Sequence, residues 1–226
     1  FELWRQFSET DYPRLLELVT NVNMPSFMRV IPIGETIEAK SRVLSYEDAR
    51  AMLESSSSLA VTTCVCRKLM QRCDRPLEVC LQLNRSAEYA VRRGTGRKVT
   101  LDEALAILAT ASDAGLVHMT ENTAGRNNVL CNCCTCCCEM LRFAGDPKTR
   151  GVLAPSRFAA RVNGDECTGC GLCSEVCPMD AVAVGDSGVA VVTGDACIGC
   201  GLCANACPAG AVGLVEVRPE GFIPAA

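Results

Sequence analysis

Eight of the chain's cysteines stand in two runs that share one spacing. The first run is C-T-G-C-G-L-C-S-E-V-C-P, from Cys167 to Pro178, and the second is C-I-G-C-G-L-C-A-N-A-C-P, from Cys197 to Pro208. Three cysteines spaced C-x2-C-x2-C can wrap one corner of an iron–sulfur cube, because a tight loop brings three sulfurs around one inorganic core. The complete C-x2-C-x2-C-x3-C-P spacing, present twice, is typical of chains that hold two [4Fe–4S] clusters. We therefore predict two such clusters, which exchange single electrons.

The fourth cysteine of each run is expected to ligate the cluster of the other run, as is usual at this spacing. The predicted ligands of cluster 1 are Cys167, Cys170, Cys173 and Cys207. The predicted ligands of cluster 2 are Cys197, Cys200, Cys203 and Cys177. Paired C-x2-C motifs can also hold zinc or form disulfides. The tandem run is much more specific than a single pair, and it favours iron.

The other ten cysteines lie upstream in two groups. Four are Cys64, Cys66, Cys73 and Cys80, and six form the run C-N-C-C-T-C-C-C at Cys131, Cys133, Cys134, Cys136, Cys137 and Cys138. A packing role would not gather so many thiols beside polar Asn132, and soft thiolates select Fe–S clusters, zinc or Cu(I).

We favour iron–sulfur clusters for these ten thiols as well, because two clusters are already predicted downstream. Ten thiols suffice for two further cubes with two to spare, or for one cube and a second site, which gives three or four [4Fe–4S] clusters in total. Adjacent cysteines point in different directions, so one Cys-Cys pair can serve two centres. The assignment of each sulfur is open, and an unusual cluster or a zinc site are the alternatives.

Composition bears on the compartment and on the partners. Lys and Arg total 22 and Asp and Glu total 26, a formal net charge of −4. The chain therefore lacks the excess of positive charge that binding to nucleic acid requires. We see no signal peptide and no apolar segment long enough to insert into a membrane. Thiols at metal-like spacing are expected to stay reduced, which indicates the cytoplasm of an anaerobe. Phe1 is not an initiator Met, so we expect upstream residues to be missing.

Local signals predict the elements that position these cysteines. The clearest helix begins at a capping box, Thr100 with Glu103, and ends at Gly115. A second capping box, Ser45 with Asp48, predicts a helix to about residue 54. Further helices are predicted over residues 1–25, 76–83 and 87–93, and strands over residues 29–33, 59–65 and 212–217. The strand over residues 59–65 is expected to deliver Cys64 and Cys66, and a hairpin is expected around residues 185–188.

Residues 144–160 contain two glycines and two prolines, and we place a domain boundary there. The predicted fold is α+β. A mixed Cys-rich module of helices and strands occupies residues 1–145, and a two-[4Fe–4S] domain occupies residues 146–226. We expect the first module to be truncated at its N-terminus. So small a second domain has little core, so the clusters are expected to hold it together.

Several motifs occur in a recognisable order: R-V-I-P-I (29–33), V-T-T-C-V-C-R-K (61–68), C-D-R-P-L-E-V-C-L (73–81), A-G-L-V-H (114–118) and V-L-C-N-C-C (129–134). The order resembles a broad family of 4Fe–4S binding proteins from anaerobes. In that family a cysteine-rich module precedes a ferredoxin-like dicluster domain, and a winged-helix-like region often lies upstream. Cys136 stands where the family pattern commonly has another residue type. The resemblance extends over residues 28–210 and implies electron transfer.

The sequence contains no Ser–His–Asp set, dinucleotide fingerprint or flavin signature, and we predict no catalytic residue. We predict a polyferredoxin-like electron-transfer subunit in a hetero-oligomeric complex. It would relay electrons between a carrier and a catalytic redox subunit that depends on flavin, molybdenum or tungsten. Two alternatives stay open: an iron–sulfur redox or metal sensor, and an enzyme with a substrate-binding cluster in the upstream module.

Overall fold

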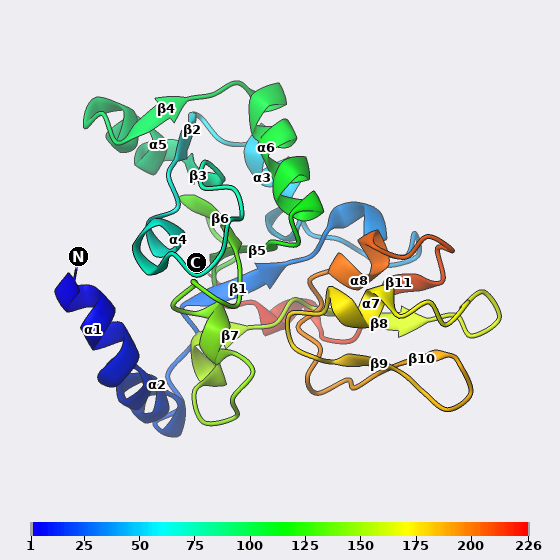
Figure 1. The fold of residues 1–226 in the computed structure, drawn as a ribbon. Coiled ribbons are helices and arrows are strands. Elements are labelled where there is room, and N and C mark those ends of the chain that lie inside the picture. Colours follow the sequence, from blue (N-terminus) through cyan, green and yellow to red (C-terminus); the bar gives the residue numbers. More distant parts are fainter. Residues whose placement is uncertain (1, 226) are drawn as a thin grey trace.

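The computed structural model describes residues 2–225 and shows an α+β fold (Figure 1). Its α-helices are α1 (Glu2–Thr10), α2 (Tyr12–Asn21), α3 (Ala49–Glu54), α4 (Val65–Met70), α5 (Asn84–Arg92), α6 (Leu101–Asp113), α7 (Leu172–Glu175) and α8 (Leu202–Asn205). Its strands are β1 (Met28–Ile31), β2 (Leu59–Thr62), β3 (Cys80–Leu83), β4 (Gly96–Lys98), β5 (Val117–Glu121), β6 (Val129–Cys133), β7 (Leu153–Ala154), β8 (Phe158–Val162), β9 (Val182–Val184), β10 (Ala190–Val192) and β11 (Val212–Glu216).

A seven-stranded sheet organises the part of the chain before residue 155, in the order β4-β2-β3-β6-β5-β1-β7. Neighbouring strands are antiparallel, except that β1 and β7 run parallel. The core at one end of this sheet contains Leu53 of α3, Leu81 of β3 and Leu130 of β6, and Leu105 and Leu108 of α6 pack against it. Burial of this apolar surface holds α3 and α6 on the sheet.

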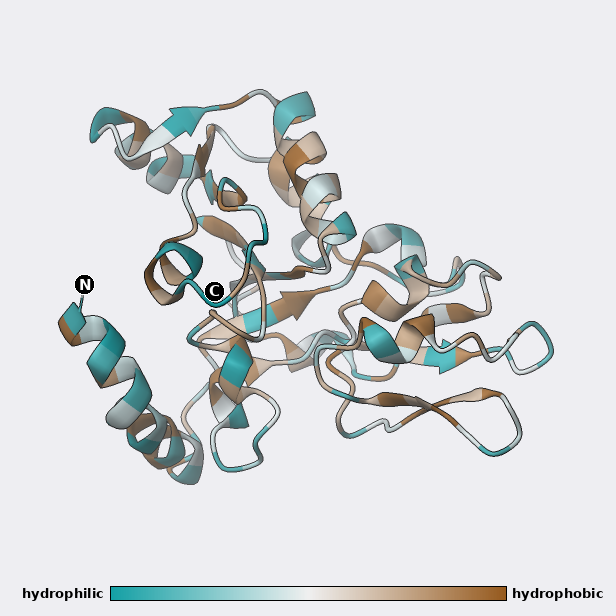
Figure 2. Cartoon of the chain, in the orientation of Figure 1, coloured by the Kyte–Doolittle hydropathy of each residue, from teal (hydrophilic) through white to brown (hydrophobic). Residues whose placement is uncertain are grey.

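Two short antiparallel pairs, β8 with β11 and β9 with β10, form the downstream part. The strand that precedes each cysteine run pairs with the strand that follows the other run, so the sequence repeat becomes a structural repeat. Helices α7 and α8 lie beside these strands (Figure 1). Phe158 and Leu214 are completely buried between them. Strands β9 and β10 are hydrophobic in Figure 2; Val182, Ala190 and Val192 pack into this small core, whereas Val184 and Val191 are exposed.

Several expected elements are confirmed. Helix α6 begins at the capping box, in which Thr100 Oγ1 accepts from the Glu103 amide at 3.2 Å and the Glu103 carboxylate accepts from the Thr100 amide at 2.8 Å. Helices α2 and α5, strands β1 and β11 and the β9–β10 hairpin also lie where the patterns predict. The predicted helix over residues 1–25 includes Phe1, which lies outside the described residues, and it divides into α1 and α2.

Three local predictions are wrong. The predicted helix from Pro76 to Leu83 is instead a loop followed by β3, because Leu81 and Leu83 are buried by pairing with β2 and β6. Helix α3 is capped by Asp48, whose side chain accepts from the Arg50 amide at 2.8 Å, and not by a box that begins at Ser45. The strand predicted to reach residue 65 ends at residue 62, and helix α4 begins at Val65 with Cys64 before its first turn.

The two parts of the chain are joined by buried contacts. Strand β7 completes the seven-stranded sheet from beyond the predicted boundary at residue 145, which stays a prediction. Arg157 is completely buried, and it donates to Glu47 Oε1 at 2.7 Å and to Glu216 Oε1 at 2.7 Å. Among residues 2–225, no helix combines the length and the apolar character needed to cross a membrane.

Candidate metal centres

Each cysteine run folds into a glycine-bearing loop followed by a short helix, α7 in the first run and α8 in the second. Gly169 and Gly199, at equivalent positions, have φ of +67° and +65°. A Cβ on Gly199 would lie 2.1 Å from the carbonyl oxygen of Phe158, and one on Gly169 would lie 2.3 Å from that of Gly188. Both loops therefore require glycine, since it adopts positive φ without strain and leaves room for the neighbouring backbone.

Backbone amides from the paired strands point at the first thiol of each run. The Ala190 amide of β10 lies 3.4 Å from Cys167 Sγ, and the Ala160 amide of β8 lies 3.5 Å from Cys197 Sγ. The Ala190 hydrogen bond lowers the pKa of Cys167, because an N–H donor favours the thiolate. Amides of this kind tune the potential of a cluster held by such thiolates.

The thiol of Cys177, from the first run, lies with the thiols of the second run. One cavity is lined by Cys177, Cys197, Cys200 and Cys203. Burial, with smaller contributions from the charges of Cys203, Cys177 and Cys197, raises the pKa of Cys200 to about 12. These four are the predicted ligands of cluster 2, so the structure places the predicted set around one space.

For the predicted ligands of cluster 1, the structure shows three of the four cysteines near one another. Burial raises the pKa of Cys173, and the nearby Cys167 and Cys170 add to the shift. Cys207 packs in the same apolar core as Cys167 and Cys173, and also as Cys197. The thirty-residue repeat relates Cys207 to Cys177, so it predicts that Cys207 completes the set of cluster 1.

The two sites have different surroundings, although their sequences are nearly identical. Cys170 is exposed, whereas its counterpart Cys200 is buried. The Ile33 amide of the upstream part donates to the Cys200 carbonyl at 3.1 Å. Cys200 also shares an apolar cluster with Cys133 and Cys138. The second site therefore lies against the Cys-rich part, and the first site faces outward.

Six upstream cysteines form one group, which we call the six-thiol group: Cys64, Cys66, Cys80, Cys131, Cys133 and Cys138. They come from the start of α4, the start of β3, strand β6 and the turn after it. Burial, together with the charges of Cys138 and Cys64, raises the pKa of Cys66 to about 12. Hydrogen bonds from the Cys133 thiol to Cys131 and Cys138 raise the pKa of Cys133, so these three sulfurs are in contact.

The remaining four upstream cysteines, Cys73, Cys134, Cys136 and Cys137, form a tighter set, the four-thiol group, in which all sulfurs lie within 4.8 Å of one another. Cys73 Sγ lies 3.9 Å from both Cys134 Sγ and Cys137 Sγ. The buried Arg67 places Nη2 3.6 Å from Cys134 Sγ. The run C-N-C-C-T-C-C-C thus divides between two groups, with Cys133 and Cys138 in one and their neighbours Cys134 and Cys137 in the other.

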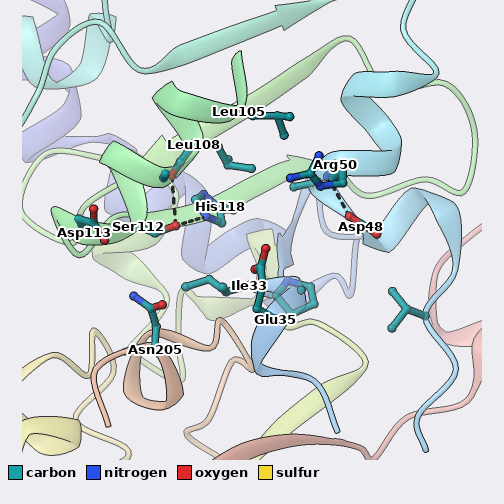
Figure 3. A pocket seen from close by; sticks show the side chains of 15 residues that line it. Ile33, Glu35, Asp48, Arg50, Leu105, Leu108, Ser112, Asp113, His118 and Asn205 are labelled. Atoms are coloured by element: carbon teal, nitrogen blue, oxygen red, sulfur yellow. Dashed lines mark hydrogen bonds between the residues drawn. The ribbon is translucent and has the colours of Figure 1, made fainter. Parts of the chain in front are cut away.

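His118, the single histidine, does not join either group. Its Nδ1 lies 2.5 Å from Asn132 Oδ1 and its Nε2 lies 2.9 Å from Ser112 Oγ. It borders a cleft of about 530 Å³ whose lining includes Glu35 and Asn205 (Figure 3). Both ring nitrogens are thus within hydrogen-bonding distance of a side-chain oxygen.

Comparison with known proteins bears on the downstream part. Residues 160–217 match the family model described as "4Fe-4S dicluster domain". Residues 160–217 form a 4Fe–4S dicluster domain. A stretch of 33 residues, 15% of the chain, is 48% identical to a "Probable ferredoxin" from Methanosarcina thermophila. The stretch covers 57% of that relative, so the likeness concerns a part of each chain.

The dicluster domain is ferredoxin-like, binds iron and sulfur, and indicates electron transfer. Reasoning from the sequence missed the two amide donors to its thiols. A signal for them existed, because Ala160 and Ala190 each stand seven residues before the first cysteine of a run. The role of β8 was also missed, since residues 144–160 were interpreted as a boundary.

Proposed function

We propose that this chain is an electron-transfer subunit that relays single electrons between a carrier and a catalytic redox subunit. The relay would use the two predicted sites of the dicluster domain and a third [4Fe–4S] cluster in the six-thiol group. When bound, a [4Fe–4S] cluster accepts and gives up one electron. The donor sets suit such clusters, because they consist of soft thiolates with backbone N–H donors beside them.

One observation carries the proposal: the second site lies between an exposed site and the six-thiol group. Cys170 of the first site faces solvent, where a partner can approach. Cys200 of the second site packs in the same apolar cluster as Cys133 and Cys138 of the six-thiol group. An isolated ferredoxin needs no such neighbour, whereas a relay needs its sites in sequence through the protein.

The surroundings of the thiols support distinct tasks for the sites. Burial around Cys200 and Cys203 raises the pKa of each to about 12 and keeps water away from the second site. The first site is more open, since Cys167 and Cys207 are only partly buried and Cys170 is exposed. We infer that an external partner, either the carrier or the catalytic subunit, docks near Cys170.

The wider setting is part of the proposal. Reduced thiols in such number suit a cytoplasm without oxygen, and the catalytic partner is proposed to depend on flavin, molybdenum or tungsten. The sensor and the substrate-binding cluster named above stay predictions, because no feature of residues 2–225 favours either over a relay.

The experiment is cluster counting followed by kinetics on anaerobically purified protein. Three cubes predict about twelve iron atoms and as many sulfides per chain. Reduction by a small external reductant is followed by stopped-flow absorbance and by freeze-quench EPR, which resolves the sites in the order of their reduction. Cys177→Ser should perturb the cluster of Cys197, Cys200 and Cys203 and slow the reduction of the upstream cluster.

The matched control is Cys207→Ser, which should disturb the cluster of Cys167, Cys170 and Cys173 and leave the Cys200 site intact. An iron content near eight per chain would remove the third cluster from the proposal. An unchanged reduction rate of the upstream cluster in Cys177→Ser would refute the relay order while leaving the dicluster domain in place.

A further inference from the structure

The sulfurs of the four-thiol group are spaced as they would be around a single metal ion. Its four sulfurs lie within 4.8 Å of one another, and two of the separations, from Cys73 to Cys134 and to Cys137, are 3.9 Å. Four thiolates at a zinc–sulfur distance of about 2.3 Å form a tetrahedron with edges of about 3.8 Å. We propose that Cys73, Cys134, Cys136 and Cys137 bind one Zn²⁺ ion in a closed tetrathiolate site.

A [4Fe–4S] cube does not fit the same sulfurs. Its ligand thiolates lie roughly 6 Å apart, because an iron–iron edge as well as two iron–sulfur bonds separates them. The dicluster domain provides a reference inside this molecule. Among residues 2–225, the four-thiol group is the one set of three or more cysteines whose sulfurs all lie within 4.8 Å of one another. No three sulfurs of the cluster-binding loops therefore come as close together as the sulfurs of the four-thiol group.

Charge and hydrogen bonding around the group suit a tetrathiolate ion. Four thiolates and one Zn²⁺ carry a net charge of −2, which must be offset when the site is partly buried. Arg67 is buried and places its guanidinium 3.6 Å from Cys134 Sγ. Its other hydrogen bonds go to the carbonyls of Pro76 at 2.6 Å and Asn132 at 3.1 Å. The arginine thus holds one charge at the thiols and anchors both chain segments that supply them.

The position of the group indicates a structural task. Cys73 lies in the irregular stretch between α4 and β3, and Cys134, Cys136 and Cys137 lie in the turn after β6. Four thiolates leave no open position for a substrate or water, as in structural zinc sites. The neighbours Cys133 and Cys138 belong to the six-thiol group, so the two sites share one turn of the chain but no ligand. Since zinc is not redox-active, the site lies outside the proposed electron relay.

The decisive measurement is zinc K-edge X-ray absorption on the full chain, purified anaerobically from medium with both iron and zinc. We expect one zinc per chain, with four sulfur neighbours at about 2.3 Å and no nitrogen or oxygen neighbour. This spectrum is recorded on the wild-type chain, so it does not depend on the folding of a variant. Absence of zinc, or zinc with nitrogen or oxygen neighbours, would overturn the proposal.

Two neighbouring substitutions separate this site from the iron–sulfur sites. Cys136→Ser should abolish the single zinc and leave iron and sulfide unchanged, whereas Cys138→Ser should lower iron and sulfide and retain the zinc. A loss of about four irons in Cys136→Ser would show a cube in the four-thiol group. A loss of one iron, with a mononuclear ferric–thiolate absorption in the wild type, would show iron in place of zinc. Both results refute the zinc assignment and leave the relay testable.

Discussion

Removal of the guanidinium of Arg157 is expected to weaken the junction between the two parts of the chain. Its side chain is 0% exposed and binds Glu47 with two hydrogen bonds, at 2.7 and 3.0 Å. It also binds Glu216 at 2.7 Å and donates to the carbonyls of Arg42 and Arg218. Arg157→Met keeps much of the side-chain volume but leaves the Glu47 carboxylate, 2% exposed, without its partner.

The expected loss of stability in Arg157→Met follows from the burial of this ion pair. Removing one partner of a buried ion pair costs about 3–5 kcal/mol, because the remaining charge is left in a poorly solvating environment. The matched control is Arg161→Met, four residues later in β8. Its side chain is 56% exposed and pairs with Glu38 at 2.9 Å, and exposed pairs contribute about 0.2–1 kcal/mol.

The assay is anaerobic urea unfolding of variants with equal iron content, followed by far-UV circular dichroism and cluster absorbance. With a slope of about 2–3 kcal/mol per molar urea, Arg157→Met should lower the midpoint by on the order of 1–2 M, and Arg161→Met by less than about 0.5 M. The double variant Glu47→Met with Arg157→Met should recover part of the loss, since the buried carboxylate of Glu47 is no longer left unpaired. Equal midpoints for the two single variants would refute the reasoning.

Two further predictions concern the second cluster loop and the single histidine. Gly199→Ala forces a Cβ to within 2.1 Å of a carbonyl oxygen, so iron per chain should fall by about four, whereas Gly210→Ala, at a φ of +64° with open space around it, should retain its iron. Burial lowers the pKa of His118, with opposing contributions from Asn132 and Glu35. The native state therefore favours the neutral imidazole, and its stabilisation is complete above about pH 6.5 and is lost as the pH falls through that value, by at most about 1.4 kcal/mol per pH unit. The difference in urea midpoint between the wild type and His118→Gln should change between pH 7.5 and 5.5, and a constant difference would contradict this linkage.

The parts of the fold that the sequence predicts are those fixed by local chemistry. The capping box at Thr100 satisfies amides within its own first turn, so the sequence is sufficient to locate α6. The cysteine runs carry their own glycines, and the glycine requirement reappears in the structure as positive φ. In each case, the residues that form the feature are adjacent in the chain.

The predictions that fail depend on partners distant in sequence. Pro76 and the apolar residues that follow suggest a helix, but Leu81 and Leu83 are each buried in a strand that has neighbours on both sides. The division of the ten upstream cysteines is of the same kind. Cys73 joins sulfurs more than sixty residues further along the chain, and nothing near Cys73 distinguishes it from Cys66 or Cys80.

The two cysteine runs are nearly identical in sequence, but different segments of the chain pack against them. Ile33 and the apolar cluster that contains Cys133 and Cys138 cover the second loop, whereas Cys170 in the first loop is exposed. Lower exposure changes the cost of charge at a cluster and therefore its potential. The sequence repeat itself is symmetric, so contacts with the Cys-rich part of the chain make its two sites different. The two sites should therefore differ in reduction potential when the whole chain is present. Titration of the two sites by EPR in the intact protein tests this, and equal potentials would show that the contacts around Cys200 have no electrostatic effect.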